Sequence, residues 1–320
     1  MILRTLLALL LGASASLAAA QAWPTKPLRL VVTFAPGGSS DIVARALAVP
    51  LQGKLGQPVL VENKPGAGGS IGATDFARAA PDGYSLLMSN TTPISLSPFM
   101  LDPQPYDPLK SFTHVSLVAT VPDVVMVHPS VAANSLAELV AWIRAQNRPV
   151  NFGSGGIGSI GHILGETFKK ELGLRIEHVG YKGSAPMITD LIGGTLSFSF
   201  DTLPQNVPHM KAGKLRPVAV TSRARAAIAP DIATVVEQNM PFLVAENFIG
   251  VSAPAGLAEP VARRLHGAIQ ESLDDATFAR RLAEFGLTVR KMSQPDFQAF
   301  LQAQIRGWEP AVRASGAKLN

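Results

Sequence analysis

The chain has 320 residues, of which 47% are hydrophobic and 16% are charged, so it is too apolar for a disordered protein and long enough for two domains. The formal net charge is +5, and the basic residues are scattered without interleaved aromatic residues, which argues against nucleic acid as a partner. The absence of cysteine excludes disulfides, thiol nucleophiles and cysteine-bound zinc.

The first 22 residues have the pattern of a secretory signal peptide. Arg4 is their only charge, an apolar run extends from Leu6 to Leu11, and Ala20-Gln21-Ala22 fits a cleavage site of small residues. No later stretch reaches the roughly 18 uncharged apolar residues that a membrane span needs. We therefore expect an exported mature protein that resides in the periplasm and is not embedded in the membrane.

Strands and helices alternate in the first hundred residues. Short apolar runs typical of buried strands are followed by segments with apolar residues at helical spacing. This order indicates an α/β fold with a mostly parallel sheet, whose ligands bind beyond the carboxyl ends of the strands. The expected elements are strands at 28–34, 59–63 and 85–89 and helices at 41–55 and 73–79.

Two long extended apolar stretches, 112–128 and 242–253, are predicted to cross between two domains. Between them lie a helix that begins at a capping box, Ser135-Leu136-Ala137-Glu138, and a strand that leads through a glycine-rich loop into a further helix. The C-terminal part is predicted to be helical. The first domain is then discontinuous, formed by residues 23–122 and 246–320, and the second domain comprises residues 123–245.

Two glycine-rich loops, 34–41 and 151–159, each join a predicted strand to a helix. The start of a helix offers unpaired backbone N–H groups and a partial positive charge, and glycine lets a ligand approach the backbone closely. Two such loops, one from each domain, would grip a small anion between them.

Two short glycine-containing motifs suggest other activities. Residues 153–158 match the dinucleotide fingerprint G-x-G-x-x-G, but no acidic residue ends the next strand at the required distance. Residues 68–72 match the nucleophile elbow G-x-S-x-G, but a turn precedes them where the elbow requires a strand. A secreted hydrolase that uses Ser70 or Ser159 with a histidine remains the alternative of a different class.

Three single residues have both a structural and a functional interpretation. Asp41, in the first turn of its helix, either caps N–H groups or accepts a hydrogen bond from a ligand amine or hydroxyl. His162 follows the second loop and either donates to a bound anion or is structural. Asp201 ends a predicted strand on the side where ligands are expected. No pair of histidines or carboxylates has metal-ligand spacing, so we expect neither a metal nor a cofactor.

With these residues in place, the chain resembles the Bug family, the extracytoplasmic solute receptors associated with tripartite tricarboxylate transporters. The resemblance covers nearly the whole mature chain, and its motifs are specific in their order and spacing rather than singly. They include Pro36-Gly37-Gly38-Ser39-Ser40-Asp41, Val61-Glu62-Asn63-Lys64-Pro65-Gly66-Ala67-Gly68-Gly69, Pro81-Asp82-Gly83-Tyr84, Tyr181-Lys182-Gly183, Asp190-Leu191-Ile192-Gly193-Gly194 and Lys211-Ala212-Gly213-Lys214-Leu215-Arg216.

The resemblance implies a two-lobed periplasmic binding protein of type II-like fold, each lobe a mostly parallel sheet flanked by helices, with the ligand cleft between the lobes. It implies a monomeric, non-enzymatic receptor that binds a small carboxylate (a di- or tricarboxylate, an amino acid or an aromatic acid) and delivers it to membrane transporter subunits. A receptor subunit of a signalling system would have the same pocket. The ligand-binding residues it implies are Phe34, Gly37, Gly38, Ser39 and Asp41 in the first loop, Ser154, Ser159 and His162 in the second, and Asn90, Thr91 and Asp201 elsewhere.

The sequence departs from the family pattern at a few positions. Gly180 stands where the family usually has proline before Tyr-Lys-Gly, and Phe248 stands where tryptophan is usual. These differences fall mainly outside the two loops. They leave the predicted anion site intact and make the identity of the ligand harder to transfer from relatives.

Overall fold

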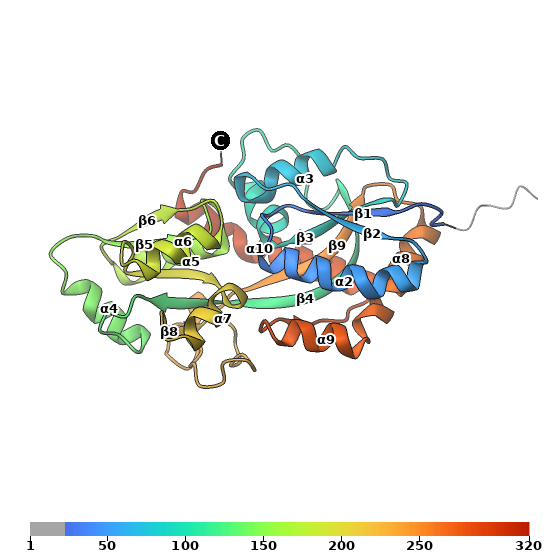
Figure 1. The fold of residues 1–320 in the computed structure, drawn as a ribbon. Coiled ribbons are helices and arrows are strands. Elements are labelled where there is room, and N and C mark those ends of the chain that lie inside the picture. Colours follow the sequence, from blue (N-terminus) through green and yellow to red (C-terminus); the bar gives the residue numbers. More distant parts are fainter. Residues whose placement is uncertain (1–22, 320) are drawn as a thin grey trace, which may run out of the picture.

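The fold is built on one ten-stranded sheet that extends through both halves of the molecule (Figure 1). The computed structural model describes residues 23–319, so the predicted signal peptide lies outside the described residues. The strand order is β2-β1-β3-β9-β4-β7-β5-β6, and both β8 and β10 pair with β4. Strands from the beginning of the chain therefore lie at one end of the sheet, and strands from the middle of the chain lie at the other.

Within each lobe, the strands that alternate with helices are parallel. In the first lobe β1 (Leu28–Val32) pairs in parallel with β2 (Val59–Asn63) and with β3 (Ser85–Asn90). In the second lobe β5 (Val150–Ser154) pairs in parallel with β6 (Ile176–Gly180) and with β7 (Phe198–Thr202). The predicted α/β fold with two lobes is confirmed, and the carboxyl ends of these strands lead into the helices described below.

Two long strands connect the lobes. β4 (Phe112–Val127) and β9 (Glu246–Pro254) run antiparallel to each other, where the sequence predicted crossing segments. β4 continues into the second lobe, where it pairs antiparallel with β7 and with β8 (Arg216–Val220), and β10 (Thr288–Val289) adds to its first-lobe part. The sheet is thus mixed, because the crossing strands oppose the parallel strands on either side of them.

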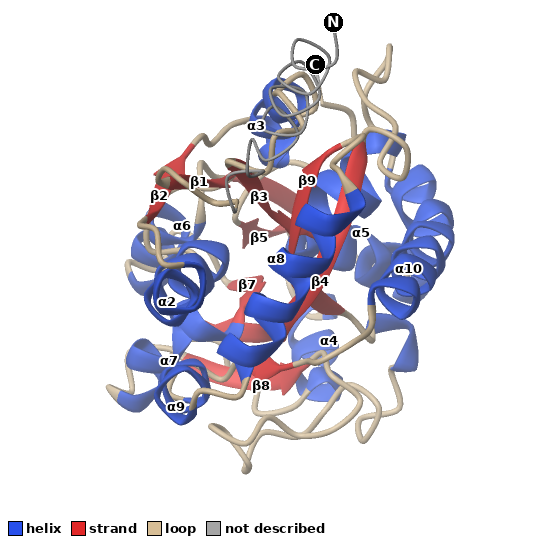
Figure 2. Cartoon of the chain, turned by 90° about the vertical axis from the view of Figure 1, so that its right-hand side faces the viewer, coloured by secondary structure: helices blue, strands red, loops and turns tan. Residues whose placement is uncertain are grey.

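Helices cover both faces of the sheet in each lobe. In the first lobe, α2 (Ser39–Leu55), α8 (Glu259–Leu273) and α9 (Ala276–Ala283) share one core, and α3 (Ser70–Phe76) and α10 (Gln294–Ser315) share another. Figure 2 shows α8 lying over β4 and β9 and running along them. In the second lobe, α4 (Leu136–Arg144) and α5 (Ile160–Leu172) pack on one side, and α6 (Ser184–Ile192) and α7 (Leu203–Lys211) on the other.

The C-terminal end of α10 leaves the first lobe. Val312 and Leu319 are buried in the same core cluster as Leu139 of α4 and Ile163 of α5, and the Leu319 N–H donates to the Met100 carbonyl at 3.0 Å. The predicted division of the chain assigned all of residues 246–320 to the first domain. In the structure the last residues of the chain pack with the second lobe, so α10 contacts both lobes as β4 does.

One close contact fixes the position of α5 on its sheet. Gly165 lies against the ring of Phe152 on β5, and a Cβ at this position would overlap ring atoms. Phe152 itself is fully buried among Phe198, Phe200 and His178. The absence of a side chain at Gly165 therefore lets α5 approach β5 closely, which places the beginning of α5 at the cleft.

Candidate functional site

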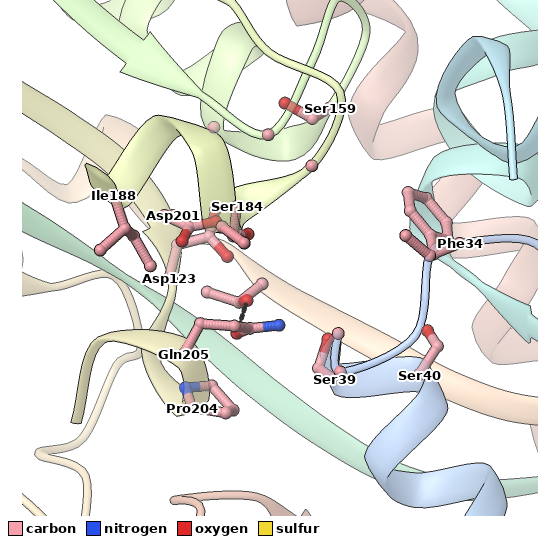
Figure 3. Close-up of a pocket in the computed structure, with 18 of the residues that line it drawn as sticks. Phe34, Ser39, Ser40, Asp123, Ser159, Ser184, Ile188, Asp201, Pro204 and Gln205 are labelled. Atoms are coloured by element: carbon pink, nitrogen blue, oxygen red, sulfur yellow. Dashed lines mark hydrogen bonds between the residues drawn. The ribbon is translucent and has the colours of Figure 1, made fainter. Parts of the chain in front are cut away.

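A cavity of about 590 Å³ lies between the lobes and is lined by residues from both. Figure 3 shows Phe34, Ser39 and Ser40 of the first lobe on one side of it, with Asp123, Asp201, Ser184 and Ile188 of the second lobe on the other. This size suits a small organic molecule. The lining includes the beginnings of four helices, α2, α5, α6 and α7.

The first glycine-rich loop places the beginning of α2 at the cavity. Gly37 has a φ of +85°, which glycine adopts without strain, and Gly38 is the N-cap with extended backbone. Because the N-cap residue Gly38 has no side chain to cap this helix, its first N–H groups are open to an acceptor from outside the helix. Gly38, Ser39 and Ser40 all line the cavity.

A buried carboxylate holds this loop in shape. Asp41 accepts hydrogen bonds from the Gly37 N–H at 3.0 Å, from Arg45 Nε at 3.0 and 3.1 Å, and from Asn63 Nδ2 at 2.9 Å. Asn63 Nδ2 also donates to the Phe34 carbonyl. Burial acts to raise the pKa of Asp41, but these hydrogen bonds outweigh it and hold the pKa below its usual value. Asp41 is therefore an ionised support behind the loop.

The second loop leads into α5 through a chain of polar contacts. Ser159 is the N-cap and accepts from the His162 N–H, and its Oγ donates to Ser154 Oγ at 3.1 Å. Ser154 Oγ lies 2.7 Å from His178 Nε2, and the ring of His178 stacks on that of His162 at 3.8 Å. Burial lowers the pKa of His162 to about 4, and burial together with His162 lowers the pKa of His178 to about 3. Both rings are neutral at pH 7.

Two further helix beginnings line the cavity, and sequence reasoning missed both as sites. α6 begins after Gly183, and Ser184 lines the cavity. α7 begins after Thr202, and Pro204 and Gln205 line the cavity. Thr202-Leu203-Pro204 is a helix-start signal that could have located the second of them, because threonine favours the N-cap and proline the first turn.

Two acidic side chains share the second-lobe wall. Asp201 accepts from Ser184 Oγ at 2.7 Å and from Asn206 Nδ2 at 3.0 Å, yet its burial raises the pKa to about 6. Asp123 is 2% exposed, and burial together with the neighbouring Asp201 raises its pKa well above the usual value. This wall thus combines two helix beginnings with two carboxyl groups that ionise reluctantly.

Most of the chain matches known receptors. The model for the tripartite tricarboxylate transporter family receptor matches residues 43–317. The chain belongs to this receptor family. It is 35% identical to protein BugT of Bordetella pertussis over 94% of this chain and 92% of BugT. Among solved structures, it resembles R. palustris Rpa4515 with adipate, with 32% identity and a TM-score of 0.87 over 92% of this chain and 99% of that one. It also resembles MatC of Rhodopseudomonas palustris with bound malate, with 27% identity and a TM-score of 0.84 over 91% of this chain and 100% of that one.

Seven of the predicted binding residues of this receptor line the cavity. They come from the first loop, from the end of β3, from the beginning of α5 and from the end of β7. Asn90 is the β3 residue, and its Nδ2 donates to Ser40 Oγ at 3.0 Å. The seven are Phe34, Gly37, Gly38, Ser39, Asn90, Ser159 and Asp201.

Four predicted residues lie outside the cavity lining of the receptor. Asp41 supports the first loop, and Ser154 and His162 support the second, as described above. Thr91 connects the end of β3 to β9, because its Oγ1 accepts from the Phe248 N–H at 2.9 Å and its own N–H donates to Asn247. These side chains hold the elements that form the cavity, since their polar atoms are bonded to the protein itself.

The hydrolase motif has no catalytic geometry in the receptor. Ser70 Oγ donates to the Ala67 carbonyl at 2.7 Å, and a 3₁₀ turn, Ala67–Gly69, precedes it where the nucleophile elbow requires a strand. In residues 23–319 no cluster of three histidine or acidic side chains is arranged to hold a metal, and no helix has the length and apolar character needed to cross a membrane. The family consists of solute-binding receptors, which are not enzymes.

Proposed function

We propose that this receptor captures a small carboxylate in the periplasm and delivers it to the membrane subunits of a tripartite tricarboxylate transporter. The observation that carries the proposal is the convergence of four helix beginnings on one cavity between two lobes. Two solved relatives support it, one with adipate and the other with bound malate. In this proposal the signal peptide is removed on export and the mature chain acts as a monomer.

Anion binding follows from the partial positive charge of each helix beginning. One such end favours an anion by roughly 0.3 to 1 kcal/mol when exposed and by up to ~2 kcal/mol when partly buried. The uncapped end of α2 and the α5 end near Ser159 would hold the carboxylate between the lobes. The lobes, 23–122 with most of 246–320 and 123–245 with the C-terminal end of α10, would close on it by bending where the chain passes between them at the end of β4's first-lobe part and the beginning of β9. No bond in the ligand needs to break.

The test is calorimetric titration of the mature protein with a panel of mono-, di- and tricarboxylates, together with mass spectrometry of whatever co-purifies. We expect one class of acid to bind without being consumed. A panel in which no acid binds, or in which a bound acid is turned over, would reject the receptor proposal.

A substitution at the first loop localises the site. Gly38 has a φ of −73°, and a Cβ there would lie 3.5 Å from its nearest neighbour, so the fold accommodates a side chain. Gly38→Val would place methyl groups at the uncapped end of α2 and is expected to abolish binding with an unchanged melting temperature. Gly53→Val, on the open side of the same helix, is the matched control and should bind as the wild type does.

A further inference from the structure

Asp123 is a buried carboxyl group with a side-chain oxygen that no described residue bonds. It lies on β4 opposite Thr202 of β7, its side chain lines the cavity, and it is 2% exposed. Its Oδ1 has no hydrogen-bond partner among the described residues, although its backbone N–H and carbonyl are both bonded to Thr221. A buried polar atom without a partner destabilises the fold, and more so when it is charged.

The neighbouring carboxyl group, that of Asp201, does have hydrogen-bond partners in the protein. Asp201 lies on the adjacent strand and already receives hydrogen bonds from Ser184 and Asn206. The described cations form no ion pair with either carboxyl group. The other titratable side chains that line the cavity are Lys182 and His209. Lys182 is exposed and forms no ion pair with Asp123 or Asp201, so neither carboxyl group has a cation bonded to it among the described residues.

We propose that Asp123 receives the cationic end of the ligand, so that the preferred solute is an amino-bearing carboxylate whose ammonium group lies away from its carboxylate. The carboxylate would bind at the beginnings of α2 and α5, and the ammonium would donate to Asp123, with Asp201 adding charge behind it. This inference rests on the proposed receptor function and specifies the solute.

Dicarboxylates and unsubstituted alkanoates fit the wall formed by Asp123 and Asp201 less well. A dicarboxylate would bring a second negative charge against Asp201, whose pKa of about 6 leaves it ionised at pH 7, and like charges close together in a protein interior are unfavourable. An ammonium group would instead favour the ionised form of Asp123, which burial and Asp201 disfavour in the empty protein. An unsubstituted alkanoate would leave Asp123 without a partner after closure has excluded water. An ammonium group supplies both the missing donors and the missing positive charge.

The experiment compares matched acids of equal chain length in calorimetric titrations: pentanoate, glutarate and 5-aminopentanoate, with the corresponding four- and six-carbon sets. At the best length we expect the amino acid to bind at least about tenfold more tightly than the dicarboxylate. The ammonium group of the amino acid would pair with Asp123, whereas the second carboxylate of the dicarboxylate would be repelled by the acidic wall. In Asp123→Asn this preference should fall to about threefold or less. Asp231→Asn, the same change at an exposed aspartate, should keep the preference.

The outcomes separate this inference from the receptor proposal. Binding of several acids with equal affinity, or tighter binding of the dicarboxylates, would overturn the role of Asp123 and leave the receptor function standing. A preference for the amino acids that survives in Asp123→Asn would also overturn it. Failure of every acid to bind would reject both. The wild-type comparison decides the solute class even if Asp123→Asn does not fold.

Discussion

The side-chain oxygen of Gln205 accepts a hydrogen bond from the Ser39 backbone N–H at 2.8 Å when the amide nitrogen faces Thr202. Gln205 lies in the first turn of α7 in the second lobe, and Ser39 is the first residue of α2 in the first lobe. The contact therefore joins the lobes across the cavity, with Gln205 and Ser39 on facing walls in Figure 3. The amide oxygen occupies the uncapped helix end that we assign to the ligand carboxylate.

Removal of this amide should open the ligand-free protein. In Gln205→Ala nothing replaces the bond to Ser39, so we expect a larger radius of gyration than in the wild type when no ligand is present. With saturating ligand the two proteins should have the same radius, because the carboxylate then joins the lobes. Small-angle X-ray scattering measures both states, and equal radii without ligand would show that the contact does not hold the lobes together.

Asp41 should affect affinity without touching the ligand. Asp41→Ala removes the acceptor for Gly37, Arg45 and Asn63, so we expect about 1 to 3 kcal/mol loss of unfolding free energy and at least tenfold weaker binding as the loop loosens. Urea denaturation and calorimetric titration measure the two effects. Asp75→Ala, which breaks only the exposed pair with Lys64, is the control and should change both quantities little. Wild-type affinity in Asp41→Ala would contradict the supporting role.

Buried histidines should make the protein less stable in mild acid. His114, His162 and His178 have pKa values lowered by burial to about 4, 4 and 3, so the folded state binds fewer protons than the unfolded state below about pH 6.5. Stability should therefore fall as the pH drops from 6.5 toward 4. Urea denaturation at pH 7, 6 and 5 measures this slope, and a flat profile would contradict the neutral state of these rings.

Asp201 should stabilise the folded protein in mild acid, in contrast to the buried histidines. Its pKa is raised to about 6, so its contribution to stability is present below the unfolded pKa and is lost as the pH rises through about 6. Removing it in Asp201→Asn should therefore make the acid-induced loss of stability steeper, by at most about 1.4 kcal/mol per pH unit. The same denaturation series, run on both proteins, gives the comparison. An unchanged slope in the variant would mean that Asp201 ionises normally, and a shallower slope would mean that folding lowers its pKa.

Substitution by alanine at the two helical glycines Gly165 and Gly267 should have opposite effects on the unfolding free energy. At Gly165 a Cβ would overlap Phe152, so Gly165→Ala is expected to lower the unfolding free energy by about 1 to 3 kcal/mol. At Gly267 in α8 no atom lies within 4 Å of the new Cβ, so Gly267→Ala should raise it by about 0.5 to 1 kcal/mol. Thermal denaturation measures both, and an equally tolerated Gly165→Ala would mean that α5 can move away from its sheet.

Local signals predicted much of the fold. The capping box at Ser135 begins α4, and the Ser135 side chain accepts from the Glu138 N–H as expected. The crossing segments appear as β4 and β9. α3 begins at Ser70 rather than at residue 73, because Gly68 and Gly69 have positive φ and the helix starts directly after them. The packing of α10 against the second lobe has no local signal, since it depends on contacts far apart in the chain.

The site could be predicted only in part. Glycine-rich loops mark backbone that a ligand can approach, and Gly38, Ser39 and Ser159 do line the cavity. Periodicity cannot tell which way a polar side chain in the first turn of a helix faces, so Asp41 and His162 were indistinguishable from cavity residues. Asp123 was missed because it interrupts a long apolar strand, where its burial beside Asp201 emerges only when the two strands pair.

The pairing of β4 with β9 has a consequence for how the molecule comes apart. β4 contributes to the cores of both lobes through Val118 and Val125, so a cut between residues 122 and 123 would divide a strand that is paired on both sides. Neither half of the chain retains a complete sheet after such a cut. The two lobes should therefore melt together, as a single cooperative peak in calorimetry, although the proposed closure moves them relative to each other.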